Sequence, residues 1–305
     1  MGKIVVGKQG MSRPVLLQPR AGITGLPFRD RVSSFGGGLV VSEMVASHEI
    51  MQKGQSAHAR AELGLNAEFT SVQIAGRDAH WMAESAKFVA AKGAQVIGIN
   101  MGCPAKSVVN GSAGSALMRT PDLALQLIEA VVNAVAVPVT LIPRFGWDDD
   151  DLNAPQLARS AQDAVVQMIT IHGRTRFQFY NGTADWNAIR SVKESVDVPV
   201  IATGVIVNTD TAKTAMQQSG ADGVMIGRGA QGKPWLLAQV AADIFGTPVP
   251  NIPKNDELRN MIKSHYAAMI DFYGPEQGNK VARKHLGWYM DDLPVTTDQR
   301  RALQT

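Results

Sequence analysis

Short apolar runs rich in β-branched residues alternate with stretches of helical periodicity along most of the chain. The apolar runs are eight in number and lie at 14–18, 39–43, 70–76, 95–100, 137–144, 168–173, 198–204 and 222–227. Helical patterns follow most of them, as at 78–93 and 121–135. Near-continuous apolar strands separated by amphipathic helices indicate a parallel sheet that is covered on both faces.

Eight strand–helix units predict an α/β protein built as a (β/α)8 or TIM barrel. An open, doubly wound sheet made of the same elements is the alternative. A proline-rich segment at 246–255 ends the alternation, and two more charged helical stretches follow at 256–274 and 279–290. We therefore expect a barrel domain over residues 1–245 and a small C-terminal helical domain over residues 246–305.

The composition and the lengths of the apolar runs argue against a secreted protein and against a membrane-spanning one, and exclude few other classes of protein. The first residues contain no apolar run of signal-peptide length, and no later run approaches the length of a membrane span. Cys103 is the single cysteine, so an internal disulfide is impossible, which fits a reducing compartment. We expect a cytoplasmic monomer. The net charge of +3 permits a polyanionic partner without requiring one.

Polar residues and glycines stand at the carboxyl ends of the predicted strands, where a TIM barrel carries its chemistry. These are Gln73, Arg144, His172, Thr203 with Gly204, and Gly227 with Arg228. Each alone can be a strand cap or turn residue. Glycines after the last two strands let backbone N–H groups approach an anion, and Arg228 adds a positive charge. We predict a site for a phosphate-bearing ligand such as flavin mononucleotide (FMN); tight barrel turns are the alternative.

Cys103 lies just past the fourth predicted strand, between a glycine and a proline, and three roles are open to it. It can be a buried inert thiol, or a nucleophilic thiolate if a cation or helix N-terminus lowers its pKa. It can also be a general acid, because an ordinary thiol is mostly protonated at neutral pH. One cysteine and scattered histidines lack ligand spacing, so we predict no metal site.

Several basic residues allow both a binding and a structural interpretation. His172 can hydrogen-bond a substrate or a flavin phosphate, or simply end a strand. Arg174 and Arg176 can contact an anion or form a solvated face. In the tail, Lys280, Arg283 and Lys284 lie at helical spacing beside two aromatic residues, a combination that suits RNA but also an ordinary solvated face.

Nine segments, taken together and in order, resemble the tRNA-dihydrouridine synthases, above all the bacterial DusB type. They are PRAGITGLPFR, VSEMVAS, VQIAGR, INMGCPAKSVVNGSAGSALM, RFGWDD, QMITIHGRTR, FYNGTADW, GVMIGRGAQGKPW and VARKHLGWY. The resemblance implies an FMN-containing TIM barrel whose C-terminal helical domain binds tRNA, with NADPH as the reductant. It implies reduction of tRNA uridines to 5,6-dihydrouridine, with hydride from the flavin to C6 and a proton from Cys103 to C5.

The resemblance and the residue patterns described above together give the candidate site residues. The cofactor-binding candidates are Gln18, Pro19, Arg20, Gln73, Arg144, His172, Thr203, Gly204, Val205, Gly227 and Arg228. The substrate-binding candidates are Asn100, Lys106, Arg174, Arg176, Lys280, Arg283 and Lys284.

Departures from the family pattern concentrate at the flavin. The family usually has Ala-Pro-Met at 18–20, a lysine near the flavin N1 and C2 carbonyl at Ile142, asparagine and aspartate at Thr203 and Val205, and aspartates at Gly25 and Gly98. A second function therefore stays open: a non-catalytic relative that keeps RNA binding but binds flavin weakly or not at all. A third is an FMN barrel oxidoreductase acting on a small molecule, against which VARKHLGWY argues.

Overall fold

Eight parallel strands close into a barrel in the computed structural model, which describes residues 4–7, 9–11, 13–52, 55–64 and 70–304. In their order around the barrel the strands are β3 (Val15–Leu17), β4 (Val40–Val41), β6 (Thr70–Ala75), β7 (Val96–Met101), β8 (Val139–Pro143), β9 (Met168–His172), β10 (Val200–Thr203) and β11 (Gly223–Ile226). Pairing of β11 with β3 closes the ring, with Val224 opposite Val15. The predicted TIM barrel is confirmed, and the open sheet is wrong.

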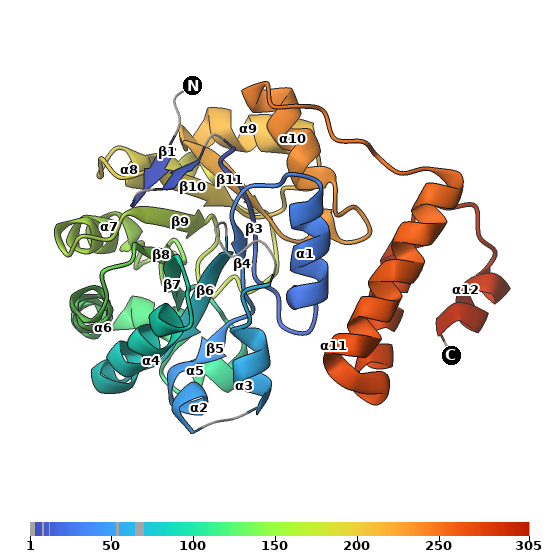
Figure 1. Ribbon diagram of the computed structural model, residues 1–305. Coiled ribbons are helices and arrows are strands. Elements are labelled where there is room, and N and C mark those ends of the chain that lie inside the picture. The colour runs from blue at the N-terminus through green and yellow to red at the C-terminus, as the bar shows by residue number, and fades with distance from the viewer. Residues whose placement is uncertain (1–3, 8, 12, 53–54, 65–69, 305) are drawn as a thin grey trace.

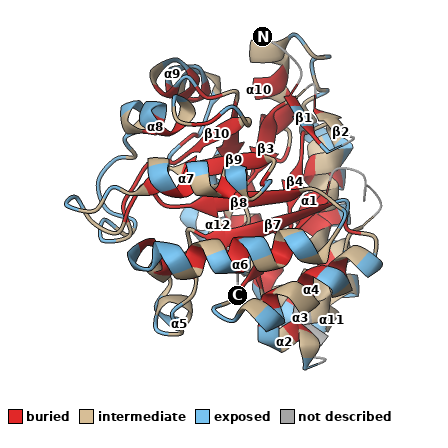
Figure 2. Ribbon diagram, turned by 90° about the vertical axis from the view of Figure 1, so that its left-hand side faces the viewer, coloured by how far each residue is buried: buried red, intermediate tan, exposed pale blue. Residues whose placement is uncertain are grey.

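Helices surround this barrel, and the longer ones bury one face against it (Figures 1 and 2). They are α1 (Leu26–Ser34), α2 (Ser47–Met51), α3 (Gln55–Arg60), α4 (Ala79–Ala91), α5 (Lys106–Val109), α6 (Pro121–Ala134), α7 (Ala154–Asp163), α8 (Trp186–Lys193), α9 (Thr209–Ser219) and α10 (Leu236–Phe245). In α6 the buried residues are Ala124, Leu127, Ile128 and Val131, which is the spacing of one helical face. Burial of each large aliphatic side chain contributes about 1.5–3 kcal/mol.

The second strand of the barrel is interrupted. After β4 the chain leaves the sheet and returns as β5 (Val45–Ala46), which pairs with the far end of β6. Ser42, between the two pieces, is buried and its hydroxyl accepts a hydrogen bond from Gln73 N–H. The sequence predicts one strand at 39–43, so the second piece is a finding of the structure.

A hairpin lies across the N-terminal end of the barrel. Strands β1 (Ile4–Val6) and β2 (Gln9–Met11) pair antiparallel. Their side chains Ile4, Val6 and Met11 belong to one apolar cluster with Leu16 and Met225 of the barrel. This end of the barrel is therefore filled with hydrophobic side chains.

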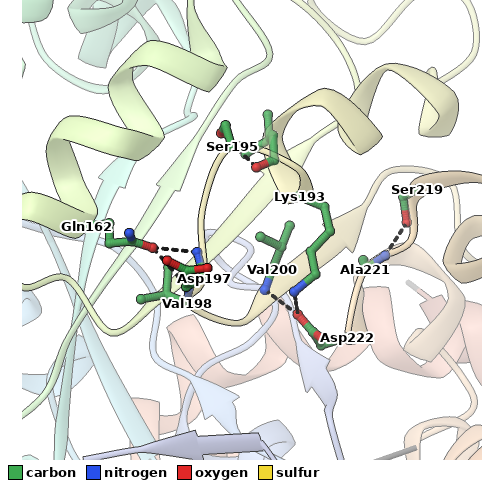
Figure 3. A network of polar contacts seen from close by, with 10 residues as sticks. Gln162, Lys193, Ser195, Asp197, Val198, Val200, Ser219, Ala221 and Asp222 are labelled. Carbon is green, nitrogen blue, oxygen red and sulfur yellow. Dashed lines mark hydrogen bonds and ion pairs between the residues drawn. The ribbon is translucent and has the colours of Figure 1, made fainter.

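The turns at the same end are joined by polar contacts (Figure 3). Gln162 Oε1 accepts hydrogen bonds from the N–H groups of Asp197 (2.7 Å) and Val198 (3.1 Å). Asp222 Oδ2 accepts from the N–H of Val200 and from Lys193 Nζ, both at 2.8 Å. These bonds fix the starts of β10 and β11, so this face serves stability and leaves the opposite face for chemistry.

Two helices follow the barrel: α11 (Asn255–Tyr289) and α12 (Thr297–Gln304). The backbone of α11 leaves the helical conformation at Gly274 (φ 76°, ψ 165°), before Pro275. The two arms pack on each other through Met269, Val281 and Ala282. The two predicted helical stretches are thus present; the division into domains at residue 245 stays a prediction.

α11 packs on α1. The Phe28 ring packs against the rings of His265 and His285, with centroids 5.9 and 4.9 Å away, and the two imidazole rings also contact each other, with centroids 4.9 Å apart. His285 Nε2 is 3.2 Å from the carbonyl oxygen of Ile23. Arg31 donates a hydrogen bond to Ser264 Oγ (2.7 Å). Among the described residues, no helix combines the length and the apolar character needed to cross a membrane.

Candidate active site at the mouth of the barrel

A cavity of about 320 Å³ opens at the carboxyl ends of β3, β9, β10 and β11. Its lining residues are Gln18, Arg20, His172, Arg174, Tyr180, Thr203, Gly204, Val205, Ile206, Val207, Met225, Gly227 and Arg228. Eight of the eleven predicted cofactor residues are therefore brought together; Pro19, Gln73 and Arg144 lie outside the lining. A cavity at this face is where TIM-barrel enzymes bind their ligands.

Two glycines bring the backbone to the cavity wall. Gly204 has φ 129°, a conformation that side chains disfavour, and a Cβ there would lie 2.5 Å from Ala184 Cβ. Gly227 leaves no space for a Cβ, because Gln18 Oε1 lies against it. Val205, between β10 and the exposed rim, has φ 56°, which is strained for a β-branched residue. Strained backbone concentrates at functional sites, which agrees with a binding role for this loop.

The cavity is positively charged. Arg20, Arg174 and Arg228 line it, and of the described residues in the lining none is acidic. Burial, and secondarily Arg228, lower the pKa of Arg20 and of Arg174. Burial and three nearby arginines hold the pKa of His172 well below 6.5, so its ring is neutral. An uncompensated group of guanidiniums is an environment that favours an anion.

Arg174 and Arg176 make contacts within the protein. Arg174 Nε and Nη2 donate to the carbonyls of Asn181 (2.9 Å) and Gly182 (2.6 Å), so this arginine fixes the loop between β9 and α8. The Arg176 guanidinium lies 4.9 Å from the ring centroid of Trp147. Substrate contact by either residue stays a prediction.

Cys103 lies in a short loop after β7 that is fixed from both sides. Its N–H donates to Asn100 Oδ1 (2.9 Å), and its carbonyl accepts from the N–H and the hydroxyl of Ser115, both at 3.0 Å. Gly114 has φ 59°, and a Cβ there would lie 2.7 Å from the Cys103 carbonyl oxygen. The GSAGSALM segment therefore supports the cysteine loop.

The thiol of Cys103 is half-buried, and its burial raises its pKa above the ordinary value despite the opposing effect of Arg144. A raised pKa keeps the proton on sulfur at neutral pH. Of the three roles that the sequence leaves open, this favours the general acid over the thiolate nucleophile.

Gln73 and Asn100 form a buried amide pair in the barrel interior. Asn100 Nδ2 donates to Gln73 Oε1 (2.8 Å), while Gln73 Nε2 has no partner among the described residues. Ser71 Oγ, near Gly98, is likewise buried and without a described partner. An unsatisfied buried donor costs about 1–3 kcal/mol, so Nε2 is available for a carbonyl oxygen of a ligand.

Arg144 holds loops together. Its Nε donates to the carbonyl of Gly102 (3.0 Å), and Nη1 donates to those of Thr175 (3.0 Å) and Phe179 (2.8 Å). Burial lowers its pKa to about 10. The side chain thus joins the Cys103 loop to the loop after β9. It supports the site, and direct cofactor contact stays a prediction.

The remaining candidates are dispersed. Lys106 is exposed at the start of α5, and Pro19 is half-buried. In α11, Lys280 pairs with Glu276 (2.8 Å), Lys284 Nζ lies 3.4 Å from the Gly22 carbonyl, and Arg283 is exposed. Ile142 is buried in the apolar cluster of the barrel interior and does not line the cavity.

Four lining residues were missed by sequence reasoning: Tyr180, Ile206, Val207 and Met225. Met225 carries a usable signal, because it precedes Gly227 by two on the same strand and strand side chains alternate between faces. Tyr180 and Val207 are exposed loop residues without a periodic pattern, so nothing in the sequence points to them.

A TIM barrel that places a cationic cavity and a protonated cysteine at the same mouth has the organisation of an enzyme of this barrel class. Residues 16–305 match the family model described as Dihydrouridine synthase (Dus). The chain is 56% identical over 292 residues to a "Probable tRNA-dihydrouridine synthase" of Rhodobacter capsulatus, covering 95% of this chain and 90% of that relative. It is 40% identical over 297 residues to "tRNA-dihydrouridine synthase B" of Vibrio vulnificus, covering 97% and 92%. The chain belongs to the tRNA-dihydrouridine synthase family, which confirms the resemblance.

Solved structures share the fold at low identity. A 2-naphthoyl-CoA reductase complex superposes with a TM-score of 0.63 and 12% identity, over 81% of this chain. The match spans 53% of that chain, so the present chain corresponds to about half of its length. At this identity the likeness supports the barrel fold alone.

Proposed function

We propose that this chain is an FMN-dependent tRNA-dihydrouridine synthase that reduces uridines in tRNA to 5,6-dihydrouridine with NADPH as the reductant. The observation that carries the proposal is the arrangement of the mouth. A cationic cavity with glycine walls lies at the ends of β10 and β11, and a protonated cysteine lies past the end of β7. Family membership supplies the uridine substrate.

The residues present fit a phosphorylated flavin. Arg228 and the backbone at Gly204 and Gly227 suit a phosphate group, and Gln73 Nε2 is a buried donor without a described partner. FMN, when bound, supplies the hydride chemistry, while the protein binds and orients it.

The chain itself contributes the proton. Cys103 Sγ–H donates to C5 of the uridine ring, and no base beside the thiol is required because the acid form is the one used. Arg144 and Ser115 hold the cysteine loop in place. The target base must leave its stack in the tRNA to reach this mouth.

A non-catalytic relative that keeps RNA binding is the second candidate, and two observations favour it. Ile142 places an apolar side chain where the family usually has a lysine, which removes a cation that would stabilise negative charge developing on a reduced ring. Gln18, packed against Gly227, also occupies space at the cavity wall.

Two measurements decide between these functions. The visible absorption spectrum of the purified protein, before and after addition of FMN, shows whether flavin binds. Mass spectrometry of unmodified tRNA incubated with the protein and NADPH shows whether dihydrouridine forms, with Cys103→Ala as the matched control. We expect a flavin spectrum from both proteins and dihydrouridine from the parent only. Protein that stays colourless with added FMN and leaves the tRNA unchanged is the non-catalytic relative.

A further inference from the structure

We propose that Arg20 and Arg228 form a two-arginine phosphate site, in which Arg20 makes the cavity select a phosphorylated ligand. Resting on the proposed function, this means that Arg20 discriminates FMN from riboflavin. The residue is unusual for its family position, so the selectivity would belong to this chain's own pocket.

Strand pairing brings the two arginines together. β3 and β11 are hydrogen-bonded neighbours, with Leu17 opposite Ile226. The pairing continues one residue further, because Gln18 N–H donates to the Ile226 carbonyl (2.9 Å). Arg20 and Arg228 follow these two strand ends and line the same cavity.

Neither guanidinium group bonds to another described residue of the protein. Arg20 donates a hydrogen bond through its backbone N–H to Thr24 Oγ1, but its guanidinium, like that of Arg228, makes no hydrogen bond or ion pair with any described residue. Arg174 and Arg144 differ, because backbone carbonyls accept from both of them. The charged groups of Arg20 and Arg228 are thus available for a ligand.

The electrostatics require a counter-charge. Arg20 is half-buried and faces Arg228, and both burial and this like charge lower its pKa. Of the described residues in the lining, none is a carboxylate that would compensate. A phosphate dianion between two guanidiniums removes the repulsion and accepts charge-assisted hydrogen bonds from both, in the geometry that arginine favours.

A third group points to the same ligand. His172 lines the cavity, and its buried Nδ1 has no partner among the described residues. Because the ring is neutral, one nitrogen carries a proton, and Nδ1–H is able to donate to a phosphate oxygen. The alternative for Arg20 is a contact with the flavin ring in place of the cation missing at Ile142. Ile142, however, does not line this cavity.

The test compares two flavins that differ only in the phosphate. Flavin is removed, and FMN and riboflavin are titrated separately, with quenching of flavin fluorescence as the readout. The proteins are the parent, Arg20→Met, Arg20→Lys and Arg77→Met, the last removing an exposed arginine outside the cavity. Unliganded melting temperatures show that each variant is folded.

We expect Arg20→Met to weaken FMN binding by about tenfold or more and to leave riboflavin binding unchanged, as for loss of one charge-assisted contact. Arg20→Lys should retain part of the preference, and Arg77→Met should match the parent. Equal weakening of both flavins would place Arg20 at the ring and overturn the proposal. Tighter binding of both would show that Arg20 obstructs the cavity, which overturns it as well.

A third titration separates this proposal from the proposed function. Inorganic phosphate is added to the flavin-free proteins, and the melting temperature is followed. If no flavin binds but phosphate stabilises the parent and not Arg20→Met, the phosphate site stands and the flavin function fails. If phosphate and flavins leave the melting temperature of the parent unchanged, the two-arginine site is refuted.

Discussion

The hydroxyl of Tyr273, in α11, occupies the space that a side chain at Gly25 would need. A Cβ on Gly25 would overlap Tyr273 Oη and lie 2.9 Å from its Cζ. Gly25 has φ −63° and ψ 174°, a conformation that any residue can adopt. Glycine is therefore required here only because there is no room for a Cβ atom. A side chain at position 25 therefore requires Tyr273 to move.

Replacement of Gly25 by alanine should force Tyr273 out and loosen α11 on α1. We expect the free energy of unfolding to fall by about 1–3 kcal/mol, as for other overpacked sites. Urea denaturation of Gly25→Ala, Tyr273→Ala and the double variant forms a double-mutant cycle. The double variant should be as stable as Tyr273→Ala alone. Additive losses would show that the two residues do not interact.

The regular part of the fold can be predicted from sequence, and this contact cannot. The runs at 95–100 and 168–173 become β7 and β9 because continuous apolar segments have few other ways to be buried. Position 25, by contrast, depends on a side chain 248 residues further along the chain. No local pattern encodes which residue of a distant helix fills a given space.

The site shows the same division. Glycines at 204 and 227 predict an anion site, because a glycine lets backbone N–H groups approach the anion and no side-chain direction has to be known. The direction of a long side chain is set by loops that sequence patterns do not define. Arg144 ends a strand as expected, yet its guanidinium turns to three loop carbonyls, whereas Arg20 turns into the cavity.

Cys103→Ala should leave the flavin content unchanged and slow dihydrouridine formation by about a hundredfold to ten-thousandfold, the usual contribution of a general acid. Single-turnover reduction of tRNA by flavin-reduced protein measures this step. Because burial raises the pKa of the thiol, the acid form persists to a pH above the ordinary range of a cysteine, and the rate should decline only beyond that range. A wild-type rate in the variant would remove Cys103 from the chemistry.

The basic residues of α11 should bind tRNA through its phosphates. We expect the triple variant Lys280→Ala, Arg283→Ala, Lys284→Ala to bind tRNA more weakly and with a shallower dependence on salt concentration. Filter binding across a salt series measures both quantities. Lys87→Ala with Lys92→Ala, in α4 and at its C-terminal cap, is the control that removes charge elsewhere. If the triple variant keeps the tRNA affinity and the salt dependence of the parent, these residues only form a solvent-exposed face and do not bind tRNA.

The packing of α11 on α1 should weaken in acid. Burial lowers the pKa of His285 from 6.5 to about 4, and burial with neighbouring His285 and Arg31 lowers that of His265. The unfolded chain takes up a proton on His285 below about pH 6.5, but the folded chain does so only near pH 4. Stability is therefore unaffected above pH 6.5 and falls as the pH decreases from 6.5 to 4.

From pH 7 to pH 5 the loss due to His285 should be about 2 kcal/mol. Urea denaturation at a series of pH values measures it. His285→Gln should flatten the profile in this range, whereas His48→Gln, at an exposed histidine of α2, should reproduce the parent profile. Parallel profiles for the parent and His285→Gln would contradict the assignment.

Phe28, whose ring packs against those of His265 and His285, also constrains the order of events during synthesis on the ribosome. Its partners are translated more than 230 residues later, which takes roughly 10–50 s at ordinary elongation rates. The strand after Pro14 likewise waits for β11 before the ring can close. The nascent chain therefore holds an open sheet and an uncovered aromatic face for most of its synthesis, a state in which chaperone binding would protect it from association with other nascent chains.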